Sequence, residues 1–496
     1  MDKNIPLHDT GGMIIKSPLD KATKLSQSSS CLVYLKREDL QPVHSFKIRG
    51  AYNKISRLTA DEMKSGVIAA SAGNHAQGVA LSAMRLGISA VIIMPQTTPS
   101  IKVEAVKGYG AEVVLEGDSY SDAFAHSQKL MAESGRVYVH PFDDPLVIAG
   151  QGTIGSEILH QLPDVTHIFV PIGGGGLIAG VASVVKQLKP VVKIIGVEPE
   201  DSNAMQASVA AGKRIELEHV GIFADGVAVK MVGEHTFAAV QKYVDESITV
   251  NTDQMCAAIK SIFEDTRSIV EPAGALGVAG LVKYAKTHDM KYAKAVAIAS
   301  GANMTFERLQ QIAERTLFGS GKEALYSVAI PEKAGALRAF CSSVVKGHSI
   351  SEFSYRLNQQ DSAKVTIGIG VTSQADKQRF ETKMESKGYR YDDLSSNELA
   401  KEHIRHMGGG RVGLNIVEYF YQINFPERPG ALANFLDHIG DGWSITLFHY
   451  RTSASDTGNV LIGFRCSDRS TLEKTLLETG YEFLEVDPEI STNYLK

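Results

Sequence analysis

The chain has 496 residues, of which 44% are hydrophobic and 22% charged, with a formal net charge of -5. These values are typical of a globular protein long enough for several domains. Charge of both signs mixed along the chain gives no electrostatic basis for nucleic-acid binding, and no apolar run reaches membrane-spanning length. The N-terminus has no basic region followed by an apolar run, so we expect a cytoplasmic protein without a secretory signal.

Short apolar runs alternate with helical periodicity from about residue 30 to residue 300. Near-continuous apolar runs are typical of parallel strands that are covered on both faces. We expect strands at residues 31–35, 66–71, 89–95, 111–115, 167–172, 192–197 and 295–299, and helices at 76–86 and 121–133. This alternation predicts βαβ units with helices on both sides of the sheet.

The chain beyond about residue 318 is organised differently. A linker-like F-G-S-G-K-E stretch (318–323) follows a charged helix expected at 307–317, and the remaining sequence repeats itself with an offset of 95 residues. The offset relates Tyr355-Arg356 to Tyr450-Arg451 without gaps, which favours two related units over unrelated β segments that share a turn. Each unit is predicted to run strand, loop, helix, strand, strand, helix, strand, the order of a ferredoxin-like βαββαβ fold.

The four cysteines, Cys31, Cys256, Cys341 and Cys466, lie far apart and form no C-x-x-C pair. This spacing favours reduced, mostly buried thiols over a disulfide or a metal site. The H-P-F-D-D sequence at residues 140–144 is interpreted as a strand-end loop that lines a site, not as a metal cluster. We therefore predict no metal.

Lys47 lies in the segment H-S-F-K-I-R-G, between Phe46 and Ile48 at the start of an expected helix. A lysine among apolar groups can lose its charge through desolvation, and a neutral amine can form a Schiff base. Most lysines are solvated surface charges, so the case for Lys47 depends on the segments that accompany it.

Asn74 follows the strand expected at 66–71, in the glycine-bounded turn S-A-G-N-H. Ligands bind at the carboxyl ends of strands in open α/β sheets, and an amide there can hydrogen-bond a phenolic oxygen without adding charge. An Asx turn or a helix cap would also explain Asn74, and these roles are compatible with the first. His75 is assigned no role.

Four consecutive glycines, at residues 173–176, follow the strand expected at 167–172 and precede an apolar helix. Glycines here let backbone N–H groups converge on an anion at the helix N-terminus. Residues 174–179 also satisfy G-x-G-x-x-A, and Glu198 lies at a fitting distance for a dinucleotide site. We favour a monophosphate, because a dinucleotide site would leave the other segments unexplained.

Ser300 ends the strand expected at 295–299 and enters a turn at Gly301. A helix cap would explain Ser300 alone. Its hydroxyl is also a neutral partner for a pyridine nitrogen, and with a Schiff-base lysine, an amide and a glycine cradle it completes the groups that hold pyridoxal phosphate. The set predicts this cofactor, in chemistry that expels a leaving group from Cβ after the α-proton is removed.

Taken together, the segments resemble biosynthetic threonine dehydratase, also called threonine deaminase. The resemblance runs from about residue 10 to the C-terminus and rests on residues 36–53, 71–80, 140–154, 173–177, 197–202 and 300–304. It implies a fold-type II pyridoxal-phosphate enzyme, an α/β fold with two open, twisted, mostly parallel sheets flanked by helices, followed by two C-terminal α+β, ACT-like units. His44 and Asp225 depart from the family's common residues, which leaves fine substrate preference open.

The resemblance also implies a role for each site residue. Lys47 would carry the cofactor as an internal aldimine and act as the catalytic base. The residues implied to contact the cofactor are Phe46, Lys47, Asn74, Gly173, Gly174, Gly175, Gly176, Leu177 and Ser300. The substrate carboxylate would be bound by Ser71, Ala72 and Gly73. The implied reaction converts L-threonine to 2-oxobutanoate and ammonia, and L-serine to pyruvate, as the first step of isoleucine biosynthesis.

The paired C-terminal units are implied to bind free amino acids, with isoleucine as feedback inhibitor and valine opposing it. A tail that only builds the oligomer is the structural alternative, and the family suggests a homotetramer. The residues expected around the effector are Tyr355, Arg356, Tyr450 and Arg451. The expected domains are residues 1–320 for catalysis, including a small subdomain at about 36–140, and residues 321–410 and 411–496 for regulation.

Three alternatives remain open at this point. Another pyridoxal-phosphate enzyme that eliminates or replaces a β-substituent, such as a serine dehydratase, serine racemase or threonine synthase, would share these segments. An NAD-dependent oxidoreductase would use the dinucleotide motif. A non-catalytic amino-acid sensor would use the tail alone.

Overall fold

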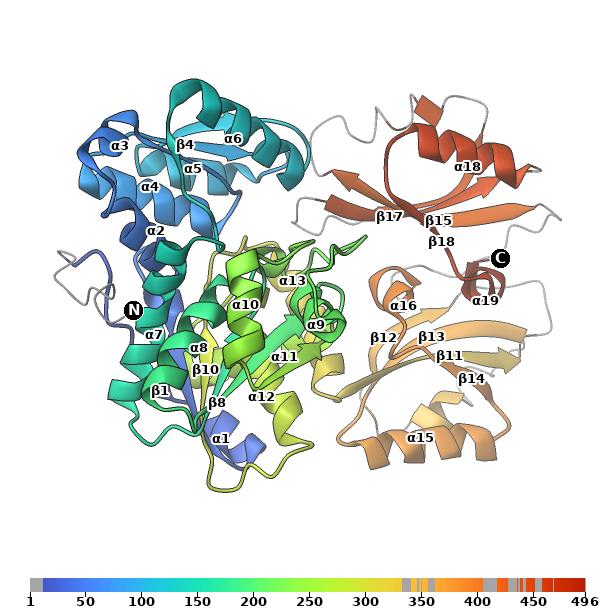
Figure 1. Ribbon diagram of the computed structural model, residues 1–496. Helices are drawn as coiled ribbons and strands as arrows, with labels where there is room; N and C mark the ends of the chain where they lie inside the picture. The colour runs from blue at the N-terminus through green and yellow to red at the C-terminus, as the bar shows by residue number, and fades with distance from the viewer. Residues whose placement is uncertain are drawn as a thin grey trace. The chain divides into compact units, whose positions relative to one another are not determined.

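The computed structural model divides the chain into two compact units, one extending to Leu309 and the other starting at Gln310 (Figure 1). The structure describes residues 12–331, 340–345, 348, 350–355, 362–404, 417–426, 435, 438–439, 443–450, 457–466 and 468–495. The domain boundaries expected from the sequence remain predictions.

The first unit contains a six-stranded sheet in the order β1-β2-β10-β7-β8-β9. Its strands are β1 (Leu19–Lys21), β2 (Leu32–Arg37), β7 (His167–Pro171), β8 (Lys193–Pro199), β9 (Glu246–Val250) and β10 (Lys294–Ala299). All neighbours are parallel except β1, which pairs antiparallel with β2 at one edge. Strand β9 was not expected from the sequence, because this half-exposed edge strand has no continuous apolar run.

A second sheet of the same unit has the order β5-β4-β3-β6 and is parallel throughout. Its strands are β3 (Val67–Ala70), β4 (Ala90–Met94), β5 (Glu112–Leu115) and β6 (Val137–Tyr138). The two central strands, β3 and β4, are buried along their whole length, which explains their apolar sequences. Strand β6 was not expected, because two residues are too short to form a recognisable pattern.

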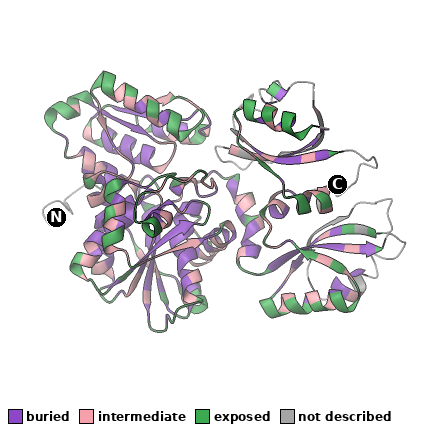
Figure 2. Cartoon of the chain, turned by 45° about the vertical axis from the view of Figure 1, so that its right-hand side comes forward, coloured by how far each residue is buried: buried purple, intermediate pink, exposed green. Residues whose placement is uncertain are grey.

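Helices lie against both sheets (Figure 1). Those nearest the smaller sheet in sequence are α2 (Lys47–Ile55), α3 (Ala60–Ser65), α4 (Asn74–Leu86), α5 (Ser100–Gly108) and α6 (Tyr120–Ser134). The others are α1 (Thr23–Ser29), α7 (Pro145–Gln161), α8 (Gly176–Leu188), α9 (Ala204–Ala211), α10 (Glu234–Tyr243), α11 (Thr252–Thr266) and α12 (Pro272–Ala285). Helix α13 (Arg308–Gly319) starts at the end of the first unit and belongs mostly to the second. Buried residues fill the interior around the strands, while the outer helix faces are exposed (Figure 2). The two mostly parallel sheets flanked by helices confirm the expected fold class.

The second unit holds two four-stranded antiparallel sheets, ordered β12-β13-β11-β14 and β16-β17-β15-β18. The first comprises β11 (Glu323–Pro331), β12 (Ile350–Tyr355), β13 (Ser362–Gly370) and β14 (Arg390–Asp393), followed by α16 (Glu398–Glu402). The second comprises β15 (Glu418–Pro426), β16 (Ser444–Tyr450), β17 (Thr457–Arg465) and β18 (Phe483–Glu485), followed by α19 (Pro488–Ile490). Helices α15 (Gln374–Ser386) and α18 (Arg469–Glu478) precede the last strand of each sheet.

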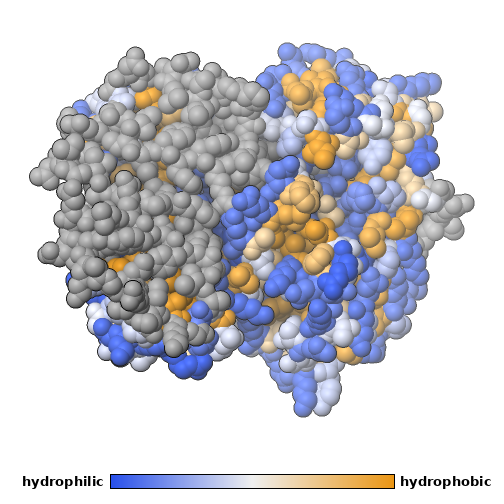
Figure 3. Space-filling model, turned by 180° about the vertical axis from the view of Figure 1, so that it is seen from behind, coloured by the Kyte–Doolittle hydropathy of each residue, from blue (hydrophilic) through white to orange (hydrophobic). Residues whose placement is uncertain are grey.

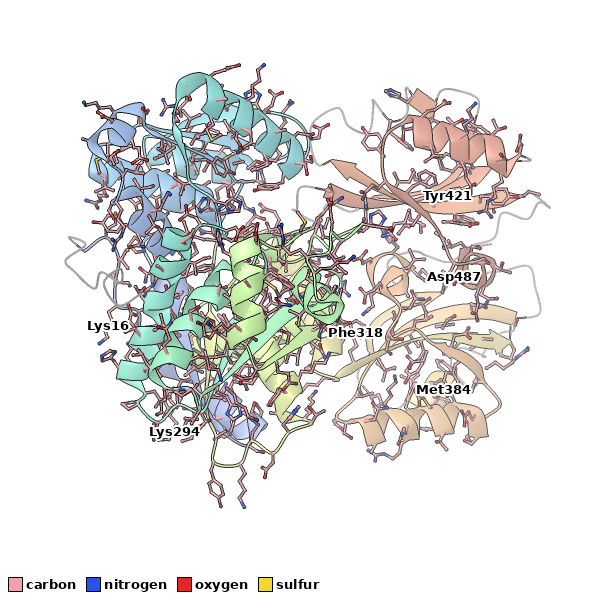
Figure 4. All side chains as sticks on the ribbon, viewed as in Figure 1. Lys16, Lys294, Phe318, Met384, Tyr421 and Asp487 are labelled. Carbon is pink, nitrogen blue, oxygen red and sulfur yellow. The ribbon has the colours of Figure 1, made fainter. Side chains whose placement is uncertain are left out.

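The internal repeat is visible in the strand pairing. Strand β15 keeps the 95-residue offset from β11 at both ends, and the register irregularity after Ile350 recurs after Ile445. Each of the two repeated segments of the second unit also has a buried hydrophobic core of its own. Met384 on α15 and Tyr421 on β15, both labelled in Figure 4, are fully buried in the first and second of these cores. The common register confirms that the two segments are related units.

The surface of the first unit carries both hydrophobic and hydrophilic side chains. Seen from behind, hydrophobic side chains gather in patches among hydrophilic ones (Figure 3). No helix in the described part of the chain is both long and apolar enough to span a bilayer. Among those same residues, no group of three or more His, Cys, Asp or Glu side chains could hold a metal ion.

Candidate active site

The residues expected to hold the cofactor all lie near the carboxyl ends of parallel strands. Lys47 begins α2, Asn74 begins α4 soon after β3, and Ser300 directly follows β10. Residues 173–176 connect β7 to α8. Because β7 and β10 are parallel neighbours in the larger sheet, the segments that follow them lie at the same edge of that sheet. Asn74 follows a strand of the smaller sheet, so its place beside them is shown by direct contacts.

Direct contacts join these segments. The Phe46 N–H donates to the Ser300 carbonyl oxygen over 3.1 Å, and Ser45 pairs with Gly301 in an antiparallel bridge. A Cβ added to Gly301 would lie 3.2 Å from the Nδ2 atom of Asn74. The lysine segment, the asparagine turn and the serine strand end therefore lie side by side.

Lys47 is held at this junction by a main-chain oxygen. Its Nζ donates a hydrogen bond to the Pro141 carbonyl oxygen over 2.9 Å and lies 5.4 Å from the centroid of the Phe46 ring. Burial, opposed in part by the negative charge of Glu271, lowers the pKa of Lys47 to about 8. The amine is therefore partly neutral near pH 7, as Schiff-base formation and proton abstraction require.

The Asn74 amide is fixed at both of its ends. Its Nδ2 donates to Glu271 Oε1 over 2.6 Å, and its Oδ1 accepts from Asn303 Nδ2 over 2.6 Å. An amide nitrogen carries two hydrogens, and the bond to Glu271 uses one of them. The side chain can thus offer a neutral donor to a ligand while its orientation stays fixed.

The glycine loop leaves no room for side chains. A Cβ on Gly174 would lie 2.3 Å from the Phe142 ring, and Gly175 has a φ of +93°, which favours glycine. Helix α8 starts at Gly176, and the first N–H groups of a helix have no partner within it. The loop therefore offers backbone donors to an anion at the positive end of a helix dipole. Leu177, the next residue, is buried.

Ser300 supplies an uncharged hydroxyl. The side chain is buried, and its Oγ lies 3.4 Å from the Ala273 carbonyl oxygen. Glu198, the acid that a dinucleotide site would need, is engaged elsewhere. Its two carboxylate oxygens accept the backbone N–H groups of Met205 and Gln206, each over 2.8 Å. Glu198 therefore caps α9 and is not available to bind a ribose.

Residues 71–73 form the turn between β3 and α4 and are partly exposed. The Gly73 N–H donates to Ser71 Oγ over 3.3 Å, and a Cβ on Gly73 would meet no atom within 4 Å. The turn, completed by Ala72, thus has open space beside it and donors of the kind that bind a carboxylate.

The loop at residues 140–144 contacts the site and also caps α7. His140 Nδ1 accepts the backbone N–H groups of Phe142 and Asp143, while Asp144 caps α7 by accepting from Leu146 and Val147. The loop contributes the Pro141 carbonyl and the Phe142 ring to the site, as the contacts of Lys47 and Gly174 show. It does lie beside the site, as the sequence suggested.

Sequence reasoning assigned no individual role to four residues of the site: Glu271, Asn303, and Pro141 and Phe142 of the loop expected to line it. Asn303 ends the S-G-A-N segment but was given no role. Glu271 stands just before a proline and a long apolar helix, an unusual place for an acid whose side chain is buried. That position was the only signal, because its partner Asn74 is 197 residues away.

Two of the four residues expected around an effector lie at strand ends of the second unit. Tyr355 ends β12 and Tyr450 ends β16, and their side chains are not among those described. Arg356 and Arg451 lie outside the described residues. Their roles remain predictions.

The donor set fits pyridoxal phosphate: a partly buried amine with a lowered pKa, a fixed neutral amide, a neutral hydroxyl, and a glycine loop that added Cβ atoms would fill. Residues 12–301 match the family model described as pyridoxal-phosphate dependent enzyme. Fold and site thus define a pyridoxal-phosphate enzyme. Residues 314–404 and 410–495 match the model for the C-terminal regulatory domain of threonine dehydratase.

Relatives narrow the assignment further. The chain is 50% identical over 476 residues to the L-threonine dehydratase biosynthetic IlvA of Burkholderia multivorans, covering 95% of this chain and 94% of that protein. Its identity to the protein of the same name from Escherichia coli K12 is 46% over 468 residues, covering 94% of this chain and 91% of that protein. A solved structure, the processed form of threonine deaminase isoform 2 from Solanum lycopersicum, aligns with a TM-score of 0.62 and 49% identity over 63% of this chain and 91% of that chain. The chain belongs to the family of biosynthetic threonine dehydratases.

Proposed function

We propose that this chain is a threonine ammonia-lyase that converts L-threonine to 2-oxobutanoate and ammonia, with Lys47 as its catalytic residue. The observation that carries the assignment is the partly buried Lys47 amine, which hydrogen-bonds the loop whose Phe142 ring also packs against Gly174. When bound there, pyridoxal phosphate supplies a conjugated ring that accepts the electrons released on loss of the α-proton.

The chain's own residues divide the work. Lys47 Nζ, with its lowered pKa, takes the proton from the substrate α-carbon. The backbone donors of residues 173–177 would bind the phosphate group, and Phe46 would pack beside the ring. Asn74 would donate to the ring oxygen, and the Ser300 hydroxyl would meet the ring nitrogen without adding charge. The turn at residues 71–73 orients the substrate by its carboxylate.

The Lys47→Ala variant tests this assignment. We expect it to lose the visible absorbance of covalently attached cofactor and to show no detectable formation of 2-oxobutanoate. Near-normal turnover in this variant would exclude the proposed role. Comparing products from threonine and serine in the unchanged protein distinguishes a threonine dehydratase from a serine-specific enzyme, the alternative suggested by the fold shared with maize serine racemase at 34% identity.

We also propose that the second unit binds isoleucine as feedback inhibitor, with valine opposing it. Support comes from the regulatory family match and from two repeated units that place Tyr355 and Tyr450 at corresponding strand ends. Inhibition at a distance requires that isoleucine bind two states of the enzyme with different affinity. Removing the chain after Gly319, where α13 ends, should leave activity that isoleucine no longer affects. Inhibition that persists in this variant would place the effector elsewhere.

Assembly as a cytoplasmic homotetramer completes the proposal. Hydrophobic side chains gather in patches on the surface of the first unit (Figure 3), and exposed apolar patches are typical of protein interfaces. Sedimentation of the purified protein gives the mass directly. A monomer at micromolar concentration would contradict the tetramer.

A further inference from the structure

Glu271 is a buried acid that the proposed reaction does not use. It immediately precedes α12, at the N-cap position, and its residue is only 4% exposed. A side chain at an N-cap normally accepts N–H groups of its own helix, but Glu271 makes no such bond. Its carboxylate instead turns away from α12 and accepts the Asn74 Nδ2–H over 2.6 Å.

The space around this carboxylate is shaped for it. A Cβ on Gly301 would lie 2.6 Å from Glu271 Oε1, and a Cβ on Gly226 would lie 3.4 Å from the same atom. The backbone N–H of Asn303 donates to the carboxylate as well. The Glu271 carboxylate therefore lies against Gly226 and Gly301 and accepts hydrogen bonds from the Asn74 side chain and the Asn303 backbone.

A chain of hydrogen bonds then fixes which end of the Asn74 amide faces each neighbour. Asn303 Nδ2 donates both to Asn74 Oδ1 over 2.6 Å and to the Val43 carbonyl oxygen over 2.7 Å, so both of its hydrogens are used. Turning the Asn74 amide over would set its oxygen against the Glu271 carboxylate and its nitrogen against the Asn303 nitrogen. Only one orientation satisfies the network.

We propose that Glu271 is a positioning residue, which holds the Asn74 amide so that its second N–H is presented to the ring oxygen of the cofactor. The inference rests on the proposed function and assigns Glu271 no direct contact with substrate. Through Asn74, the charge of one buried carboxylate is coupled to the electronic state of the ring. The same charge acts on Lys47, where it opposes the effect of burial.

The charged groups that face Glu271, or pair with its neighbour Asp225, come from four segments besides its own. Lys47 lies on α2, and Asp225 lies in the short helical turn Asp225–Val227. Lys102 of α5 pairs with Asp225 over 2.9 Å, and Arg308 pairs with it over 3.3 Å. Burial first, and then the charge of Asp225, raise the pKa of Glu271 to about 7, against the opposing effects of Asn74 and Lys102. Glu271 thus changes charge near pH 7.

Two substitutions of Glu271 distinguish the effect of its hydrogen bond to Asn74 from the effect of its negative charge. Glutamine in Glu271→Gln can still accept the Asn74 N–H but never ionises, whereas Glu271→Ala removes acceptor and charge together. Glu198→Gln is the matched control, because Glu198 is equally buried and its pKa is also raised to about 7 by burial, but it caps α9. Asn303→Ala releases the other end of the amide without touching the acid.

The measurements are the dissociation constant of the cofactor and the visible spectrum of the holoenzyme between pH 5.5 and 9. We expect Glu271→Ala to weaken cofactor binding by about tenfold or more, the effect of losing a hydrogen bond to a charged group, and Glu271→Gln to restore binding to within about threefold. We expect the unchanged protein to show a spectral transition near pH 7 as Glu271 ionises, and Glu271→Gln to remove that transition or move it by about one pH unit or more. Asn303→Ala should weaken cofactor binding in the same direction as Glu271→Ala.

Glu198→Gln should leave the spectrum and its pH dependence unchanged. Identical spectra and pH profiles in the unchanged protein and in Glu271→Gln would overturn the proposal, even if the alanine variant does not fold. Equal cofactor affinity in the alanine and glutamine variants would overturn it too. If Lys47→Ala abolishes the cofactor spectrum while Glu271→Gln alters nothing, the role of Glu271 fails and the proposed function stands.

Discussion

The Lys47 amine and the Pro141 carbonyl oxygen are 2.9 Å apart and share a hydrogen bond. A carbonyl accepts from an ammonium group and from a neutral amine alike, so this contact holds Lys47 in place in both protonation states. Because the carbonyl carries no net charge, it offsets little of the effect of burial on the lysine pKa. The site thereby combines a fixed amine with one that loses its proton readily.

We expect cofactor attachment to depend on pH through Lys47. The lysine pKa is lowered from 10.5 to about 8, and only the neutral amine attacks an aldehyde. In protein freed of cofactor, the rate of pyridoxal phosphate uptake should therefore rise with pH through about 8 and level off above it. Stopped-flow absorbance measures the rate. A rise that continues beyond pH 10 would show that the amine is not desolvated.

Gly174→Ala should weaken cofactor retention by about tenfold, the usual scale when a tight site is overpacked. The new Cβ would lie 2.3 Å from the Phe142 ring, so the loop that binds the phosphate must shift. Equilibrium dialysis of the cofactor measures the effect. Gly108→Ala is the control, because a Cβ on Gly108 meets no atom within 4 Å. Normal cofactor affinity in Gly174→Ala would show that the glycine loop does not bind the cofactor.

Much of this arrangement could be predicted from the sequence. Buried parallel strands have apolar runs, and Lys47, Asn74 and Ser300 stand at strand or helix ends within short distinctive segments. The ring of Phe142 against Gly174, and the acid of Glu271 against Asn74, could not be predicted. Such pairs depend on how the strands are ordered in the sheet, and no local pattern encodes that order. The edge strand β9 was missed for a related reason, because partial exposure leaves its sequence without an apolar run.

His75 should make the protein less stable in acid. Its Nε2 bonds the Val139 carbonyl oxygen over 2.7 Å, and burial, aided by the charge of Lys47, lowers its pKa from 6.5 to about 3. The unfolded chain binds a proton below pH 6.5 and the folded chain does not. Stability is therefore lost as pH falls from 6.5 towards 3, at up to ~1.4 kcal/mol per pH unit.

The His75→Gln variant checks this dependence. A glutamine N–H can replace the donor to Val139 without ionising, so the variant should lose less stability than the unchanged protein over the same pH range. Thermal melts at fixed protein concentration from pH 7 to 4.5 give the comparison. Parallel pH dependence in the two proteins would mean that His75 is protonated in the folded state.

Glu157 should be indispensable for the position of α2. Its carboxylate bonds Lys36 Nζ and Arg49 Nη1, each over 2.6 Å, and all three side chains are at most 5% exposed. Arg49 also bonds Glu38 over 2.7 Å and stands two residues after Lys47, so the network anchors the helix that carries the catalytic amine. Burial already lowers the pKa of Lys36 against the attraction of Glu157.

Glu157→Ala would leave Lys36 without its carboxylate partner in the interior and Arg49 with one carboxylate in place of two. Removing one member of a buried ion pair costs about 3–5 kcal/mol, so we expect a large loss of stability in chemical denaturation, together with weaker cofactor retention. Lys64→Ala breaks the Lys64–Asp61 pair, whose side chains are 79% and 94% exposed, and should change neither property. An exposed ion pair contributes little to folding stability because water and salt screen its charges. If Glu157→Ala is as stable as Lys64→Ala, the buried network does not fix α2, and the placement of Lys47 must come from the β10 and Pro141 contacts alone.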